Sequence, residues 1–126
     1  DKMSAARREL NGDISDFCRA ASACLKFGGL FYTVYVPDRL ADIICSLRAA
    51  SLEPKKLITV YPDTTAKPCL ILIEAKKGAA PSMVQAPPLI IYDSTSKSEK
   101  RTYTPDMQKI YDTFSLDFMF QQPGKR

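Results

Sequence analysis

The chain has 126 residues and a mass of 14.0 kDa, which suits one domain and leaves no room for two independent cores. Its 45% hydrophobic and 25% charged residues argue against wholesale disorder, a fibrous repeat or a membrane span. The net charge of +4 permits a nucleic-acid partner, and the absence of His removes the commonest general base and metal ligand.

The first predicted element is a helix from Ile14 to Lys26, because apolar side chains recur there at helical spacing. Asp13 is placed to cap its first turn, and the pair Gly28 and Gly29 ends it. The next run, Leu30 to Val36, is β-branched and aromatic without clean alternation. It predicts a strand that is covered on both faces.

A second helix is expected after Pro37, with Asp38 as its cap. Its apolar positions between Leu40 and Leu47 share one face, while Ser46 falls on the water side. This helix should end near Ala50 or Ser51.

Two more strands follow, Lys56 to Tyr61 and Cys69 to Ala75, separated by a short connection rich in Pro, Asp and Thr. A connection this short favours an antiparallel pair. The earlier order of strand, helix and strand implies a parallel pair with a right-handed crossover. The fold class is therefore α/β, with the antiparallel strand inserted beside one of the parallel strands.

The composition changes after Gly78. Residues 1–78 are expected to form the α/β part, and residues 79–126 a C-terminal extension. The extension begins with a Pro-rich surface strap from Ala79 to Pro88, followed by a short edge strand from Leu89 to Tyr92. A polar loop then leads to a last helix that starts at Thr104 and Pro105 and includes Phe114.

The four cysteines show none of the two-residue spacings that zinc or redox motifs use. They are expected to be buried free thiols, which suits a reducing cytoplasm. The N-terminus is charged and lacks the apolar core of a signal sequence, so a cytoplasmic location away from membranes is predicted. Because the chain opens with Asp1, a truncated product is an open possibility.

Seven segments follow one another along the chain in an order that matches a known family. They are Ala6-Arg7-Arg8-Glu9, Cys24-Leu25-Lys26-Phe27-Gly28-Gly29, Pro37-Asp38-Arg39-Leu40, Val60-Tyr61-Pro62, Leu72-Ile73-Glu74-Ala75-Lys76-Lys77-Gly78, Pro87-Pro88-Leu89-Ile90-Ile91-Tyr92 and Tyr103-Thr104-Pro105. Together they resemble the C-terminal half of class I S-adenosylmethionine-dependent methyltransferases, and more closely the tRNA adenine-N6 methyltransferases whose bacterial members modify a valine tRNA. The resemblance extends from Ala6 to about Phe114, and Arg8 departs from the His usual in the first segment.

The resemblance implies a partial Rossmann-like sheet consisting of the last three strands of the family, the final one antiparallel and lying between the other two. It also implies S-adenosylmethionine as cofactor and tRNA as partner of the full-length protein. The Gly-x-Gly turn that seats such a cofactor and the Asn-Pro-Pro-Tyr signature are both absent from the 126 residues. The chain alone is therefore expected to have no cofactor site, no catalytic residues and no activity.

Basic residues are the only site candidates, as possible contacts for RNA phosphates. The alternative, that they only keep sheet edges and loops soluble, is at least as well supported. The strand aromatics could also stack on bases, although core packing is the better explanation for them; they are Phe31, Tyr32, Tyr35 and Tyr61. The candidates are Arg7, Arg8, Lys55, Lys56, Lys76, Lys77, Lys97, Lys100 and Arg101.

Two functions remain open from the sequence. The leading one is a fragment of a methyltransferase that acts on N6 of adenine in tRNA; the other is a stand-alone α/β module that binds RNA or protein without catalysis. If the strand from Leu30 to Val36 lacks a neighbour, its free edge predicts either self-association into a homo-oligomer or an N-terminal segment that packs over the edge.

Overall fold

The computed structural model describes residues 14–93 and 102–120. The helices are α2 (Ile14–Ala23), α3 (Leu40–Ala49) and α4 (Pro105–Thr113), with two short 3-10 helices, η1 (Pro37–Arg39) and η2 (Asp117–Phe120). The strands are β1 (Leu30–Tyr35), β2 (Leu52–Tyr61), β3 (Leu70–Lys77), β4 (Val84–Gln85) and β5 (Leu89–Ile90). None of the described helices is long and apolar enough to cross a membrane.

The strands form one sheet in the order β1, β3, β2, β4, with β5 also paired to β2. Strand β3 is antiparallel to β1, with Leu30 opposite Lys76, and antiparallel to β2, with Leu57 opposite Ile73. Strands β1 and β2 therefore run parallel, joined through α3, and β3 lies between them. This confirms the predicted fold class and the predicted place of the antiparallel strand.

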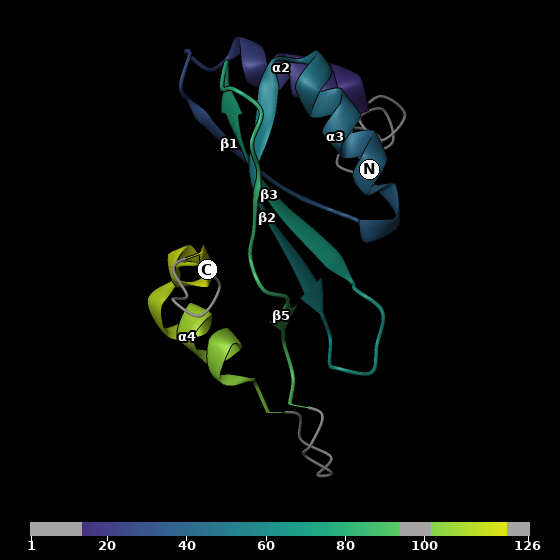
Figure 1. The fold of residues 1–126 in the computed structure, drawn as a ribbon, viewed down its shortest axis with the longest axis vertical. Coiled ribbons are helices and arrows are strands. Elements are labelled where there is room, and N and C mark those ends of the chain that lie inside the picture. Colours follow the sequence, from purple (N-terminus) through teal and green to yellow (C-terminus); the bar gives the residue numbers. More distant parts are fainter. Residues whose placement is uncertain (1–13, 94–101, 121–126) are drawn as a thin grey trace, which may run out of the picture.

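Helices cover the two sides of the sheet unequally (Figure 1). On one side α2 and α3 pack together over its upper part, where Leu47 and Ile73 are almost fully buried. On the other side α4 and η2 pack against Ile58 and Leu89, with Met119 as the buried anchor. Because side chains alternate along a strand, neighbouring residues of β2 and β3 supply the two separate cores.

The prediction that the strand from Leu30 to Val36 is covered on both faces is wrong. Phe31 and Tyr35 pack against the core under α2 and α3, whereas Tyr32 is 66% and Val34 57% exposed. The physical reason is that α4 and η2 are built on β2 and β5 and leave the second face of β1 open among the described residues. Although nearly every residue of β1 is apolar or aromatic, half-buried and exposed side chains alternate along the strand.

Three local predictions about α3 and the thiols need correction. The residue before α3 is Arg39, without a side-chain cap, because Asp38 is taken into the 3-10 turn η1. Ser46 is buried rather than on the water side, since its hydroxyl lies 3.1 Å from that of Ser15 where α2 crosses α3. All four cysteines are free, but Cys24 and Cys45 are exposed, because Cys24 lies in the turn after α2 and Cys45 on the side of α3 that faces away from the core; only Cys18 is fully buried.

The C-terminal extension joins the sheet. Within the predicted strap, β4 pairs parallel with β2, and β5 confirms the predicted edge strand. Thr104 caps α4 as predicted, because its Oγ1 accepts from the amide of Met107 at 3.2 Å. The helix ends at Thr113, and Phe114 follows in a left-handed conformation with φ 54°. The Asp13 cap and most of the polar loop lie outside the described residues.

Candidate functional site

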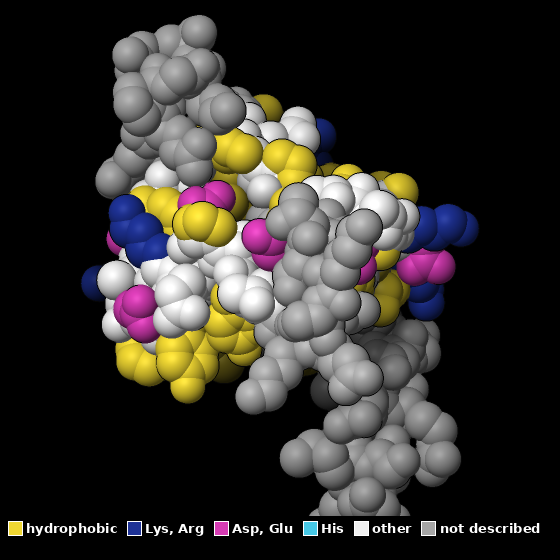
Figure 2. Space-filling view, turned by 90° about the horizontal axis from the view of Figure 1, so that it is seen from below, with side chains coloured by type: hydrophobic (Ala, Val, Ile, Leu, Met, Phe, Trp, Pro, Cys, Tyr) yellow, Lys and Arg dark blue, Asp and Glu magenta, His cyan; other side chains and the backbone are white. Residues whose placement is uncertain are grey.

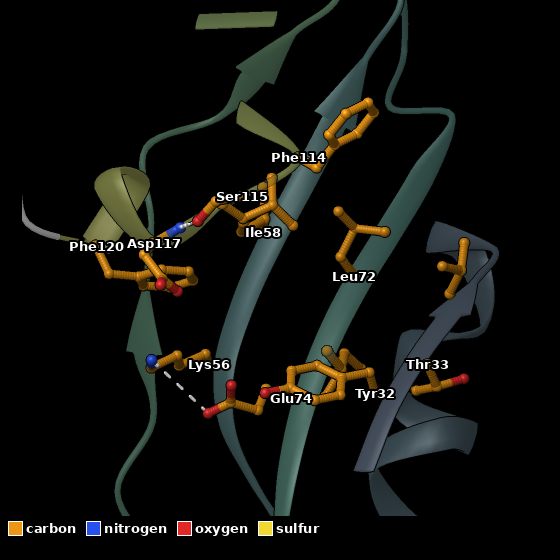
Figure 3. A pocket seen from close by; sticks show the side chains of 13 residues that line it. Tyr32, Thr33, Lys56, Ile58, Leu72, Glu74, Phe114, Ser115, Asp117 and Phe120 are labelled. Atoms are coloured by element: carbon orange, nitrogen blue, oxygen red, sulfur yellow. Dashed lines mark hydrogen bonds and ion pairs between the residues drawn. The ribbon is translucent and has the colours of Figure 1, made fainter. Parts of the chain in front are cut away.

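A pocket of about 370 Å³ lies on the side of the sheet opposite α2 and α3 (Figure 3). Strands β1, β2 and β3 form its floor, because each directs alternate side chains to this face. The segment that follows α4, from Phe114 to Phe120, forms the side wall of the pocket. The lining residues are Tyr32, Thr33, Val34, Lys56, Ile58, Leu72, Ile73, Glu74, Phe114, Ser115, Leu116, Asp117 and Phe120.

Three polar side chains meet on the floor. The ammonium of Lys56 lies 3.8 Å from a carboxylate oxygen of Glu74, its direct neighbour across β2 and β3. Tyr32 lies opposite Glu74 on the other side of β3, and a hydrogen bond to that carboxylate raises the pKa of the Tyr32 phenol. Burial and the negative charge of Glu74 act in the same direction on this pKa. Glu74 therefore links the two outer strands through their side chains.

The position of this side wall depends on the backbone conformation at the end of α4. The left-handed residue Phe114 reverses the backbone, and its amide donates to the carbonyl of Ile110 at 2.7 Å. The amide of Asp117 then donates to Oγ of Ser115 at 3.2 Å, which starts η2. This places Phe120 so that the ammonium of Lys56 lies 5.2 Å from the centre of its ring.

Of the predicted basic residues, Lys56 and Lys76 share the open face of the sheet, and the other two that the structure describes are engaged elsewhere. Lys76 is exposed. Lys55 donates to the carbonyl of Ala80 at 2.8 Å and so holds the strap to β2. Lys77 lies on the opposite face of β3.

Lys77 has a structural role at the end of α2. Its ammonium donates to the carbonyls of Ser22 and Leu25, both at 2.7 Å, and lies 5.5 Å from the centre of the Phe27 ring. The last carbonyls of a helix have no partner within the helix, and a cation there also interacts favourably with the helix dipole. These contacts explain Lys77 without any RNA.

The remaining candidates, Arg7, Arg8, Lys97, Lys100 and Arg101, lie outside the described residues. Figure 2 shows the described Lys and Arg side chains at the margins of one face, with hydrophobic side chains between them. On that face the basic residues do not gather into one patch. RNA contact by the nine candidates stays a prediction.

Apart from Lys56, the residues that line the pocket were not among the predicted site residues. Glu74 sits in an apolar run beside two lysines, where nothing in the pattern indicates that it joins three strands. Tyr32 was considered as a stacking residue but was better explained by packing, and its exposure follows only from the open face of β1. The wall from Ser115 to Phe120 had no predicted structure, and its one available signal was the apolar cluster around Met119.

The pocket combines polar groups with an apolar lining. The polar groups are one ammonium, two carboxylates, a phenol and the hydroxyls of Thr33 and Ser115, and the lining has no Cys or His. No group of three or more potential metal ligands occurs among the residues that the structure describes.

Comparisons with known proteins support the fold. No family model matches the chain, and no curated protein does. Among solved structures, a predicted O-methyltransferase from Agrobacterium tumefaciens, Atu636, is similar over 78% of this chain, with a TM-score of 0.64 and 23% sequence identity. The matched part is 45% of that protein, so this chain spans less than half its length. The chain thus has the fold of part of a methyltransferase.

Proposed function

We propose that the chain is the C-terminal part of an S-adenosylmethionine-dependent methyltransferase. In this role it completes the sheet of the enzyme and forms one wall of its substrate cleft. The 126 residues alone have no methyl-transfer activity under this proposal.

The placement of β3 carries the proposal. Strands β1 and β2 run parallel, and β3 enters between them in the opposite direction. A chain that runs from β2 to β3 through a short turn could equally have placed β3 on the outer edge of β2. The inserted position is the one that the sequence resemblance implied, and the similarity to the Agrobacterium protein is an independent support for the same fold.

The proposed acceptor is N6 of adenine in tRNA. It rests on the resemblance of segments such as Val60-Tyr61-Pro62 and Tyr103-Thr104-Pro105 to tRNA adenine-N6 methyltransferases. The name of the Agrobacterium protein specifies an oxygen acceptor for that protein, and a likeness at 23% identity supports the fold and not the acceptor.

The described residues do not fit S-adenosylmethionine. In open α/β sheets a nucleotide cofactor binds beyond the carboxyl ends of the parallel strands, on a glycine turn that allows close approach. Here Gly28, Gly29 and Gly78 all lie at the opposite end, where β1 begins. A Cβ on Gly78 would come within 2.4 Å of the Phe27 ring, so this glycine makes room for the chain's own side chain. No step of a reaction is therefore assigned to these residues.

Methyl transfer to tRNA tests the proposal. The polypeptide encoded by the complete reading frame around these residues and the 126-residue chain are each incubated with labelled S-adenosylmethionine and tRNA, and nucleosides are then separated. We expect labelled N6-methyladenosine from the former and none from the latter. Label on an oxygen acceptor would refute the proposed substrate alone. Turnover by the 126 residues, or no transfer by the complete polypeptide to any acceptor, would refute the proposal.

A further inference from the structure

Three tyrosine rings gather on the surface of the C-terminal extension. Tyr92, which follows β5, and Tyr103 form an isolated antiparallel bridge, and their rings are stacked with centroids 5.7 Å apart and planes inclined by 30°. The ring of Tyr111, on α4, lies 6.0 Å from that of Tyr103 and extends the stack. We refer to these three side chains as the tyrosine row.

Core packing does not explain the tyrosine row. Helix α4 contributes Met107 and Ile110 to the core that it shares with β2 and β5. Among the described residues, none of the three tyrosines belongs to either core of the protein. Two of them are half-buried, and Tyr111 at the end of the row is 59% exposed. Aromatic rings that lie outside both cores offer a flat apolar surface to a ligand.

The row lies at the end of the sheet where the parallel strands finish. The amide of Ile91 donates to the carbonyl of Tyr61, the last residue of β2, at 2.9 Å. The amide of Tyr92 donates to the carbonyl of Pro62 at 2.9 Å, so this tyrosine lies just beyond the carboxyl end of β2. Helix α4 begins at the same end of the sheet (Figure 1).

This is the end at which open α/β sheets bind their ligands, beyond the carboxyl ends of the parallel strands. The proposed function puts the substrate cleft there. Strands β3 and β2 separate β5 from β1, so the row lies on the side of the sheet away from any strand that joins β1.

We propose that the tyrosine row stacks on an unpaired base of the RNA substrate. The proposal rests on the proposed function, which makes tRNA the substrate, and it names a contact that holds this RNA. An adenine whose N6 reacts must leave the base stack, and the other bases of a single-stranded loop are unpaired as well. Such bases stack on flat aromatic rings whatever their identity.

Charge favours RNA over a protein as the partner of the row. The chain has a net charge of +4. In the sequence, the segment between Tyr92 and Tyr103 carries three of the predicted phosphate contacts, which lie outside the described residues: Lys97, Lys100 and Arg101. Figure 2 views the molecule from this end and shows hydrophobic side chains between Lys and Arg side chains. Aromatic rings near basic residues are the combination that binds single-stranded nucleic acid. The proposed site itself consists of the three rings.

Fluorescence anisotropy of labelled oligonucleotides with the 126-residue chain tests the stacking. One probe is a single-stranded oligoriboadenylate of about ten nucleotides, and the other has the same label, length and charge but abasic sugars. At about 50 mM salt we expect a dissociation constant of about 1–100 µM for the oligoriboadenylate. The abasic probe should bind at least about tenfold more weakly, because it keeps the phosphates and lacks the bases.

Substitutions then locate the contact. Tyr111→Leu should weaken binding of the oligoriboadenylate about tenfold and leave binding of the abasic probe unchanged. Tyr111→Phe keeps the ring and should bind both probes as the unsubstituted chain does. The matched control is Tyr32→Leu, because Tyr32 is a tyrosine of β1 with a similar exposure of 66%, and it should change neither constant. Circular dichroism checks that each variant remains folded.

Equal binding of the two probes would overturn the proposal, because charge alone would then hold the RNA. Unchanged binding by Tyr111→Leu would also overturn it, as would equal losses from Tyr111→Leu and Tyr32→Leu. If Tyr111→Leu does not fold, unchanged binding by folded Tyr103→Leu, which lacks the middle ring, would contradict it. Failure of both probes to bind would refute RNA as the partner and leave a protein surface as the alternative.

These outcomes are distinguishable from those of the methyl-transfer assay. If the complete polypeptide methylates adenine in tRNA while Tyr111→Leu binds the probe unchanged, only the role of the tyrosine row is refuted. If binding depends on the bases and on Tyr111 but no methyl group reaches RNA, only the proposed function is refuted.

Discussion

Replacing Lys77 by Met tests whether this lysine stabilises the end of α2, as the structure indicates, instead of serving as an RNA contact. The substitution keeps most of the apolar stem but removes the ammonium that donates to the carbonyls of Ser22 and Leu25, each at 2.7 Å. A hydrogen bond to a charged group contributes about 1.5–3 kcal/mol to stability. The two bonds share one ammonium, and the carbonyls can regain water at the end of α2. We therefore expect a loss of about 2 kcal/mol in the free energy of unfolding.

Urea unfolding followed by far-ultraviolet circular dichroism measures this loss. With a denaturant slope of about 2 kcal/mol/M, the midpoint should fall by about 1 M without a change in slope. Lys76→Met is the matched control, because Lys76 is the adjacent residue on the exposed face of β3, and it should change stability by less than about 0.5 kcal/mol. A Lys77→Met protein as stable as this control would refute the assigned role of Lys77.

Three further outcomes follow from the structure. Ile73→Ala should lower the free energy of unfolding by about 2–5 kcal/mol in the same urea assay, because Ile73 is 2% exposed; a change below 1 kcal/mol would contradict its place in the core. Burial raises the pKa of the Cys18 thiol, so a thiol reagent should modify exposed Cys24 while Cys18 reacts only upon unfolding, as peptide mass spectrometry can check. The raised pKa of Tyr32 favours the neutral phenol in the folded state, so its stabilising contact with Glu74 is present below the ordinary tyrosine pKa and is lost as the pH rises through the raised value. Ultraviolet titration should show this pKa fall upon Glu74→Ala, and an unchanged pKa would contradict the contact.

The order of the elements was predictable because each depends on local signals. The apolar spacing gave α2 and α3, Thr104 with Pro105 gave the start of α4, and the short turn after Tyr61 gave an antiparallel pair. The place of β3 between β1 and β2 came from the family resemblance. Hydrophobic pattern alone does not specify which of two edges a strand joins.

The exposed face of β1 and the pocket were not predictable, for one physical reason. A strand such as Leu30–Tyr35 has the same apolar composition whether its second face is covered or open, so its burial depends on which distant elements reach it. Likewise, Lys76 and Lys77 are adjacent and chemically identical, yet the strand directs one to solvent and the other to the end of α2. The different surroundings of two such neighbours are known only when the pairing register of the strands is known.

Calorimetric titration with S-adenosylmethionine tests most directly whether the chain holds one end of a methyltransferase sheet but not the site for the methyl donor. We expect no binding heat with the 126-residue chain and one site per chain with the polypeptide from the complete reading frame. Stoichiometric binding by the 126 residues alone, or no binding by the complete polypeptide, would contradict it.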